Sequence, residues 1–344
     1  MLSLKQFSHV LIIFIASVFI LYIGRDIFIP FIFALLIWFL IKQIRLVMNR
    51  VGFIERNFPE WIKNIMGFLV ILAVINFIIN IVYANFLKLA ESIDKYIAKV
   101  DVVVNIINET FNIDLMNSLY LHYQDYNISS FVFSLFNYST GLLGTIFIIV
   151  VYAIFILLEE STFKSKLERV LPHTEAFEEQ FALIKKVEKS VSKYLGLKTL
   201  ICLMTSILSY FALILVGVDF PVFWAFLIFI LNYIPIIGSY VATFLPVTFA
   251  LLQFASFTPA LILLLTVGSI QVIIGNFIDP RIMGNNVNLS PLVIILSLSF
   301  WGAVWGVIGM FLSVPLMIIV LIVFSKIPRF KPLAILMSRN GELL

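Results

Sequence analysis

Two proline-bounded apolar segments decide the fold of this chain. The first is PVFWAFLIFILNYIPIIGSYVATFLP, from Pro221 to Pro246, and the second is PLVIILSLSFWGAVWGVIGMFLSVP, from Pro291 to Pro315. Polar, proline and glycine residues interrupt the first segment at 232–239, and Trp and Gly residues interrupt the second at 301–306. Lipid offers no hydrogen bonds to freed backbone groups, so such breaks survive only inside protein or beside a water-filled cavity. Interrupted apolar segments at corresponding places in a chain indicate the substrate site of a transporter.

The composition places the chain in a membrane. Of its 344 residues, 62% are hydrophobic and only 12% are charged, whereas a soluble globular protein is about half apolar and about a quarter charged. We therefore expect lipid as a partner, and no nucleic acid, because no basic stripe lies along a polar helix. The single Cys202 excludes an intrachain disulfide, and His9, His122 and His173 are far apart in the sequence. No metal site or other cofactor is expected.

Unbroken apolar runs predict membrane-spanning helices, each needing about 20 residues to cross about 30 Å of hydrocarbon. They lie at residues 7–24, 27–41, 62–86, 139–158, 199–216 and 259–277. The arms of the two broken segments are mostly shorter, at residues 221–231, 240–254, 292–300 and 307–324. The sequence thus predicts an all-α polytopic transmembrane helix bundle with two re-entrant helical hairpins. The alternative is that the longer arms, above all residues 307–324, cross the bilayer fully.

The distribution of Lys and Arg predicts the orientation of the chain. These residues concentrate in segments 42–63, 159–198 and 326–344, whereas segment 88–131 holds three lysines among six acids. Both termini are then cytoplasmic. The unit of one span plus one hairpin occurs twice with opposite orientation, which predicts an inverted repeat. Chance placement of proline in apolar sequence is the alternative explanation.

These patterns divide the chain into five parts. They are N-terminal transmembrane helices at 1–87, an external amphipathic helix and loop at 88–137, a fourth span with a cytoplasmic loop at 138–198, a transport core at 199–325 and a cytoplasmic tail at 326–344. The external part carries a heptad pattern, which predicts a contact between subunits or an amphipathic helix packed on its own subunit or on the bilayer. Its members are Phe86, Ala90, Ile93, Ile97, Val100, Val104, Ile107 and Phe111.

Several motifs resemble the autoinducer-2 exporter family of bacterial permease-like proteins. They are NFIDPRIMGNNVNLSP at 276–291, GVIGM at 306–310, VPL at 314–316, YIPIIG at 233–238 and IPF at 29–31. Lys42 and Gln43 stand where the family pattern leads us to expect a proline. The resemblance implies a multi-pass transporter of the bacterial inner membrane that works by an elevator-like movement. It also implies a homo-oligomer, with a pentamer as the best single expectation. Members are associated with export of autoinducer-2 or with exchange of sodium or lithium for protons.

Polar groups at membrane depth supply the candidate residues for substrate binding or gating. At the first break they are Asn232, Tyr233, Pro235, Gly238 and Ser239. Their hydroxyl and amide groups can bind a small polyhydroxylated molecule, or they can satisfy the backbone opened by the break. For Ser239 we favour the structural role, and for Asn232 the functional one.

Four further candidates lie beyond the first break: Gln271, Asn276, Trp301 and Gly306. The two amides can face a bundle interior or bond between helices, and the indole of Trp301 can cover a sugar-like ring or anchor the chain at the interface. Asp279 and Arg281 are candidates for ion or proton coupling, or for an ion pair.

Three functions follow from these observations. The first is export of a small polar organic molecule, the second is monovalent cation/proton antiport, and the third is a non-transporting membrane scaffold built on the heptad region. The scarcity of buried acids weakens the second, and the polar breaks weaken the third. The sequence holds no Walker A motif for ATP and no recognisable nucleophile–base pair, so we do not expect an enzyme.

Overall fold

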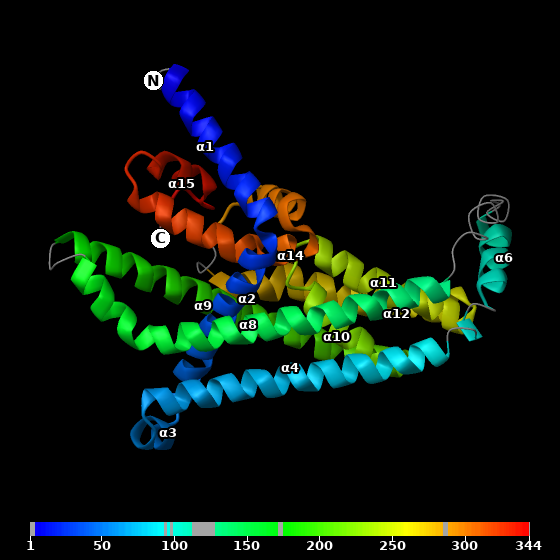
Figure 1. The fold of residues 1–344 in the computed structure, drawn as a ribbon. Helices are drawn as coiled ribbons and strands as arrows, with labels where there is room; N and C mark the ends of the chain where they lie inside the picture. The colour runs from blue at the N-terminus through cyan, green and yellow to red at the C-terminus, as the bar shows by residue number, and fades with distance from the viewer. Residues whose placement is uncertain are drawn as a thin grey trace. The chain divides into compact units, whose positions relative to one another are not determined.

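The computed structural model describes residues 4–92, 95–96, 99–111, 128–170, 175–284 and 288–343. All regular structure within these residues is helical (Figure 1). The helices are α1 (Leu4–Ile23), α2 (Arg25–Met48), α3 (Gly52–Asn57), α4 (Glu60–Glu91), α6 (Val100–Phe111), α8 (Ile128–Val170), α9 (Glu175–Val216), α10 (Pro221–Leu231), α11 (Ile237–Phe254), α12 (Phe257–Ile273), the π-helical turn η1 (Ile274–Ile278), α13 (Asp279–Met283), α14 (Pro291–Lys326) and α15 (Lys331–Met337). The all-α prediction is confirmed.

Six helices of the described part are long and apolar enough to cross a membrane. They are Arg25–Met48, Glu60–Asn85, Glu178–Val216, Ile237–Phe254, Phe257–Met283 and Pro291–Lys326. Several extend beyond the apolar runs that predicted them. Most of the charged segment 159–198, for example, is helical, because α8 continues to Val170 and α9 begins at Glu175.

The chain forms two compact units. Unit 1 comprises residues 1–68, 144–196 and 285–344, and unit 2 comprises residues 69–143 and 197–284. In unit 1, α14 packs on the first two helices. The indole Nε1 of Trp305 donates to the carbonyl of Leu21 at 2.9 Å, and the rings of Phe33 and Phe311 stack with centroids 5.9 Å apart.

The core of unit 2 joins α9, α10, α11 and α12. Leu213, Ile228, Ala250, Leu263 and Val267 are fully buried in it. Burying a large apolar side chain of this kind stabilises a fold by about 1.5–3 kcal/mol. The same core includes Tyr96, Trp224 and Phe249, so it extends to the segment that precedes α6.

The first predicted break is real but shorter than expected. Helix α10 ends at Leu231, as the sequence predicted, and α11 begins at Ile237 rather than at Tyr240. The two ends of this hairpin lie together, since the side chain of Gln253 accepts from the backbone N–H of Asp219 at 2.7 Å and donates to the carbonyl of Gly217 at 2.9 Å. The chain therefore leaves the first hairpin, residues 221–254, close to where it entered.

The second break is a single residue. Gly306 has φ 65° and ψ −144° inside α14, so the first arm runs from Pro291 to Trp305 rather than from Leu292 to Phe300. The Ser297 hydroxyl donates to the carbonyl of Ser313 at 3.1 Å, although the two residues are 16 apart in sequence. In a continuous helix that separation is about 24 Å. The chain therefore reverses at Gly306 and forms a second hairpin, residues 291–326.

Both hairpins use a glycine for close contact between their arms. A Cβ atom on Gly238 would lie 1.9 Å from the carbonyl oxygen of Leu231, and one on Gly309 would lie 1.8 Å from that of Trp301. No side chain fits at such distances, so the tight reversal depends on these two residues. The sequence singled out Gly238 and Gly306 but not Gly309.

Alanine substitutions at single glycines should show which of them the hairpins need for a tight reversal. We expect Gly238→Ala and Gly309→Ala to lower the melting temperature sharply, because the new methyl group meets backbone that cannot move aside. Gly306→Ala should cost about 1–3 kcal/mol through strained dihedrals. Gly268→Ala is the matched control, because nothing lies within 4 Å of its Cβ position. Melting temperatures of the purified protein test this, and equal values for Gly309→Ala and Gly268→Ala would contradict it.

Candidate functional site

Consecutive residues of α9 hold the tip of the first hairpin and the start of α13. The hydroxyls of Thr199 and Tyr233 are 2.7 Å apart, and Lys198 Nζ lies 3.1 Å from Asp279 Oδ2. The side chains of Lys198 and Asp279 are only 12% and 24% exposed. We call these four residues together with Asn232 the tip site.

The course of the chain explains why these residues meet. Helices α11 and α12 pack together and are joined by the two residues Ala255 and Ser256 (Figure 1). Two helices joined by so short a turn run antiparallel, so the start of α11 lies near the level of η1 at the end of α12. The break before α11 and Asp279 after η1 thus come to one end of unit 2.

Two buried amide nitrogens in this region have no hydrogen-bond partner among the described residues. They are Nδ2 of Asn232, at the tip, and Nε2 of Gln271, in the last turn of α12. An unpaired buried donor costs about 1–3 kcal/mol. Both atoms are donors, so a molecule with hydroxyl or carbonyl oxygens would satisfy them, whereas a bare cation would not.

The other candidate residues at the first break form part of the break itself or contact its backbone. The Ser239 hydroxyl donates to the carbonyl of Ile236, a backbone group of the break, at 2.8 Å. Ile236 itself has φ 63°, an unusual value for a β-branched residue. Pro235 lies within the break, and Gly238 supplies the close contact to Leu231.

The remaining candidates do not join the tip site. Asn276 and Arg281 are exposed on η1 and α13. The described ion pair of Asp279 is with Lys198 rather than with Arg281. Trp301 and Gly306 belong to unit 1, where the rings of Trp301 and Trp305 lie 4.8 Å apart beside the reversal. Of the polar stretch that precedes the second hairpin, residues 285–287 lie outside the described residues.

Sequence reasoning missed Lys198 and Thr199. Both stand where the charged half of α9 gives way to its apolar half, so Lys198 was counted only as a loop charge. The change from charged to apolar sequence within one helix is the signal that marks such residues as the edge of a buried site.

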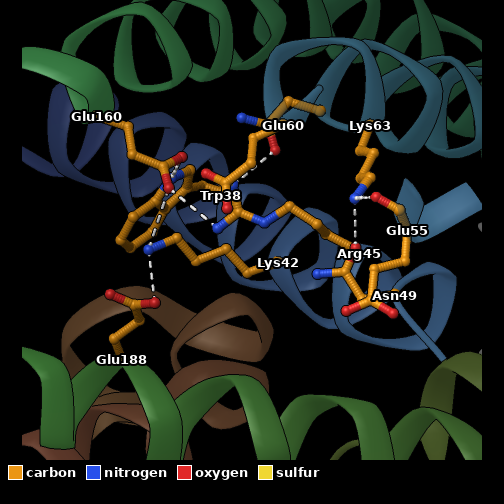
Figure 2. Close-up of polar contacts among 10 residues, drawn as sticks. Trp38, Lys42, Arg45, Asn49, Glu55, Glu60, Lys63, Glu160 and Glu188 are labelled. Carbon is orange, nitrogen blue, oxygen red and sulfur yellow. Dashed lines mark hydrogen bonds and ion pairs between the residues drawn. The ribbon is translucent and has the colours of Figure 1, made fainter. Parts of the chain in front are cut away.

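A second polar cluster lies in unit 1 and was also missed (Figure 2). Lys42 Nζ contacts Glu188 at 2.5 Å and Glu160 at 3.3 Å, and it lies 4.1 Å from the centre of the Trp38 ring. Glu160 also accepts from Trp38 Nε1 at 2.8 Å and from Arg45 at 3.3 Å. Arg45 also lies 3.8 Å from the exposed Glu60, so two cations contact three carboxylates. The cluster joins α2 to α8 and α9 through direct contacts between its charged groups.

The comparison with known proteins identifies the family. Residues 11–329 match the family described as AI-2E family transporter. The chain belongs to the AI-2E transporter family. The resemblance seen in its motifs is confirmed, and the transporter class that those motifs implied is confirmed with it.

The sequences of several relatives align with most of this AI-2E transporter. A protein of Haemophilus influenzae that carries a transport-protein name is 30% identical over 343 residues, which cover 96% of each chain. The AI-2 transport protein TqsA of Escherichia coli strain K12 is 36% identical over 227 residues, or 66% of this chain and 65% of TqsA. A transport-protein relative of Borreliella burgdorferi is 30% identical over 227 residues, or 64% of this chain and 62% of that protein.

A double-substitution cycle should show that Lys198 and Asp279 act as a pair. We expect Lys198→Met and Asp279→Asn each to lower the melting temperature, because each leaves a largely buried charge without its partner. The double variant should lie closer to the parent than the sum of the two effects predicts. Lys166→Met is the matched control, since its partner Glu159 is exposed and such pairs contribute only about 0–1 kcal/mol. Strict additivity would show that the pair does not stabilise the fold.

Proposed function

We propose that this AI-2E transporter exports a small, uncharged, polar organic molecule such as autoinducer-2 across a bacterial inner membrane. The single observation that carries the proposal is the tip site. Two buried amide donors lack partners among the described residues, in the same part of unit 2 as the hydrogen-bonded tip of the first hairpin. Family membership and the name of TqsA support the substrate class.

The proposal treats both hairpins as re-entrant. Helix α10 has 11 residues, so it reaches about 16 Å and cannot cross about 30 Å of hydrocarbon. The hydrogen bonds of Gln253 join the ends of the first hairpin, and the backbone N–H of Ser290 donates to the carbonyl of Met337 at 2.9 Å at the base of the second. Each hairpin would thus enter and leave on one side of the bilayer.

The two hairpins also support an inverted repeat. Each follows a long apolar helix, each begins with proline at the first turn, and each has a glycine of its second arm against a carbonyl of its first. We infer that the two segments of one span plus one hairpin, 199–254 and 259–326, form an inverted repeat whose hairpins enter from opposite faces. An elevator-like movement of a hairpin-bearing part against a fixed part would expose the tip site to each side in turn.

Monovalent cation/proton antiport is the second candidate, and Asp279 is the observation in its favour. Its carboxylate lies near the apolar half of α9 and is paired with Lys198. A coupling ion would have to displace this lysine, while Arg281 remains exposed. The unpaired N–H donors favour an organic substrate over a cation. A non-transporting scaffold, the third candidate, would not need unpaired donors beside a helix break.

Assembly and topology complete the proposal. We propose a homo-oligomer, with a pentamer as the best single expectation, and cytoplasmic termini. The heptad segment falls partly outside the described residues at Ile93 and Ile97. Val104 is 8% exposed within the single chain, which supports packing of part of this segment on its own subunit, beside the proposed contact between subunits.

Transport in proteoliposomes tests the substrate. Asn232→Ala should reduce autoinducer-2 flux about tenfold, the equivalent of one lost hydrogen bond of about 1.4 kcal/mol. Asn276→Ala, a matched amide on an exposed surface, should keep the flux of the parent. Lithium- or sodium-driven proton flux is measured in parallel with a pH-sensitive dye. Unchanged flux in Asn232→Ala would refute the tip site, and cation-driven proton flux without organic transport would establish the antiporter.

Cysteine labelling in a Cys202→Ser background tests the topology. Single cysteines at Lys95 and Asp125 should react with an impermeant reagent from outside intact cells. Single cysteines at Arg50 and Lys186 should react only after the membrane is opened. The reverse pattern would invert the proposed orientation.

A further inference from the structure

Unit 2 contains a polar cavity of about 450 Å³, widely open at the surface, that is separate from the tip site. It lies where the end of α4, residues 95–96 and the turn before α10 come together. Its polar lining residues are Asn85, Lys88, Glu91, Ser92, Lys95, Tyr96 and Asp219. Phe220 and Pro221, at the start of α10, complete the wall.

The sequence of α4 beside the cavity changes from apolar to charged, as helices do where hydrocarbon gives way to lipid headgroups. The apolar segment of α4 ends at Asn85, and Lys88 and Glu91 follow within two turns. Helix α9 ends at Val216, shortly before Asp219, which lines the cavity. Leu215, near the end of α9, is 87% exposed, and Leu87 on α4 is 39% exposed. Acyl chains would cover these two side chains.

Hydrogen bonds hold the walls of the cavity in place. The Tyr96 hydroxyl donates to Asp219 Oδ2 at 2.7 Å. Burial, and then the hydrogen bond and charge of Asp219, raise the pKa of the Tyr96 hydroxyl above its ordinary value. Lys99 Nζ donates to the carbonyl of Gln253, whose side chain binds the turn that leads to Asp219. The cavity is therefore built by tertiary contacts.

The cavity presents separate positive and negative groups. Lys88, Lys95 and Glu91 make no ion pair with any described residue, and Asp219 is held by a neutral hydroxyl. Lys95 Nζ lies 5.6 Å from the centre of the Tyr96 ring. Two ammonium groups and two carboxylates thus share one cavity without neutralising one another by direct contact.

We propose that this cavity binds a phosphoethanolamine group, supplied by the headgroup of a membrane phospholipid. The phosphate would lie against Lys88 and Lys95, and the primary ammonium would donate to Glu91 and Asp219. A purely anionic headgroup would meet two carboxylates of like charge. A choline headgroup has no N–H to donate to those carboxylates. The bound lipid would join α4 to the base of the first hairpin, which goes beyond the proposed transport function.

Native mass spectrometry of the delipidated full-length protein tests this proposal. Phosphatidylethanolamine, phosphatidylcholine and phosphatidylglycerol of identical acyl chains are each titrated, and water-soluble glycerophosphoethanolamine is titrated separately. We expect phosphatidylethanolamine to bind about tenfold more tightly than the other two lipids. Lys88→Gln with Lys95→Gln should remove this preference. The matched control replaces two exposed lysines of α9, Lys189→Gln with Lys193→Gln, and should retain the preference for phosphatidylethanolamine.

A second variant tests recognition of the ammonium group separately from recognition of the phosphate. Glu91→Gln should bring phosphatidylethanolamine and phosphatidylcholine to similar affinities while phosphate binding persists. Equal binding of all three lipids by the parent, or an unchanged preference in the double lysine variant, would overturn the proposal. Equally tight binding of glycerophosphoethanolamine would overturn the assignment to a lipid and identify a soluble ligand. None of these outcomes depends on whether the protein transports autoinducer-2.

Discussion

Peptide groups in an apolar environment need hydrogen-bond partners, and a helix supplies them only while it continues. Wherever this chain breaks a helix, the freed groups must find partners nearby. At the first break, the N–H of Ile234 donates to Leu231 at 2.9 Å and that of Gly238 to Ile234 at 3.2 Å, and Ser239 caps the carbonyl of Ile236. The break is tolerated because the reversal itself is hydrogen-bonded.

That constraint also explains where the polar chemistry lies. A reversal inside an apolar protein brings polar side chains with it, and some of them, such as Ser239, satisfy backbone groups. Asn232 at the tip and Gln271 on the neighbouring helix each have an amide nitrogen without a partner among the described residues, and these nitrogens are then available to a ligand. The ion pair of Lys198 with Asp279 keeps the same region electrically neutral. A neutral site with surplus donors suits an oxygen-rich, uncharged molecule.

Two other charged clusters have different roles, which depend on whether their positive and negative groups contact one another directly. In unit 1, Lys42 and Arg45 neutralise Glu160 and Glu188 through direct contacts (Figure 2), so the cluster fastens helices. In the cavity beside α10, Lys88, Lys95 and Glu91 remain without such contacts in the described part of the chain. Direct ion pairs neutralise the charges of the residues that form them, whereas separated charges leave a surface that can bind a zwitterion.

The sequence by itself determined the class, the family and the approximate helices. Apolar runs of membrane length cannot fold otherwise in lipid, and the proline and glycine breaks fixed the end of α10 at Leu231 and the reversal near Gly306. Only the tertiary structure decided which polar residues meet. Lys198 pairs with Asp279 across 81 residues, and Lys42 pairs with Glu188 across 146. The glycine that the second reversal needs for close contact is Gly309, three residues past the break. Local sequence sets helix ends through backbone chemistry, but such pairings depend on how distant helices pack, and no local pattern records that.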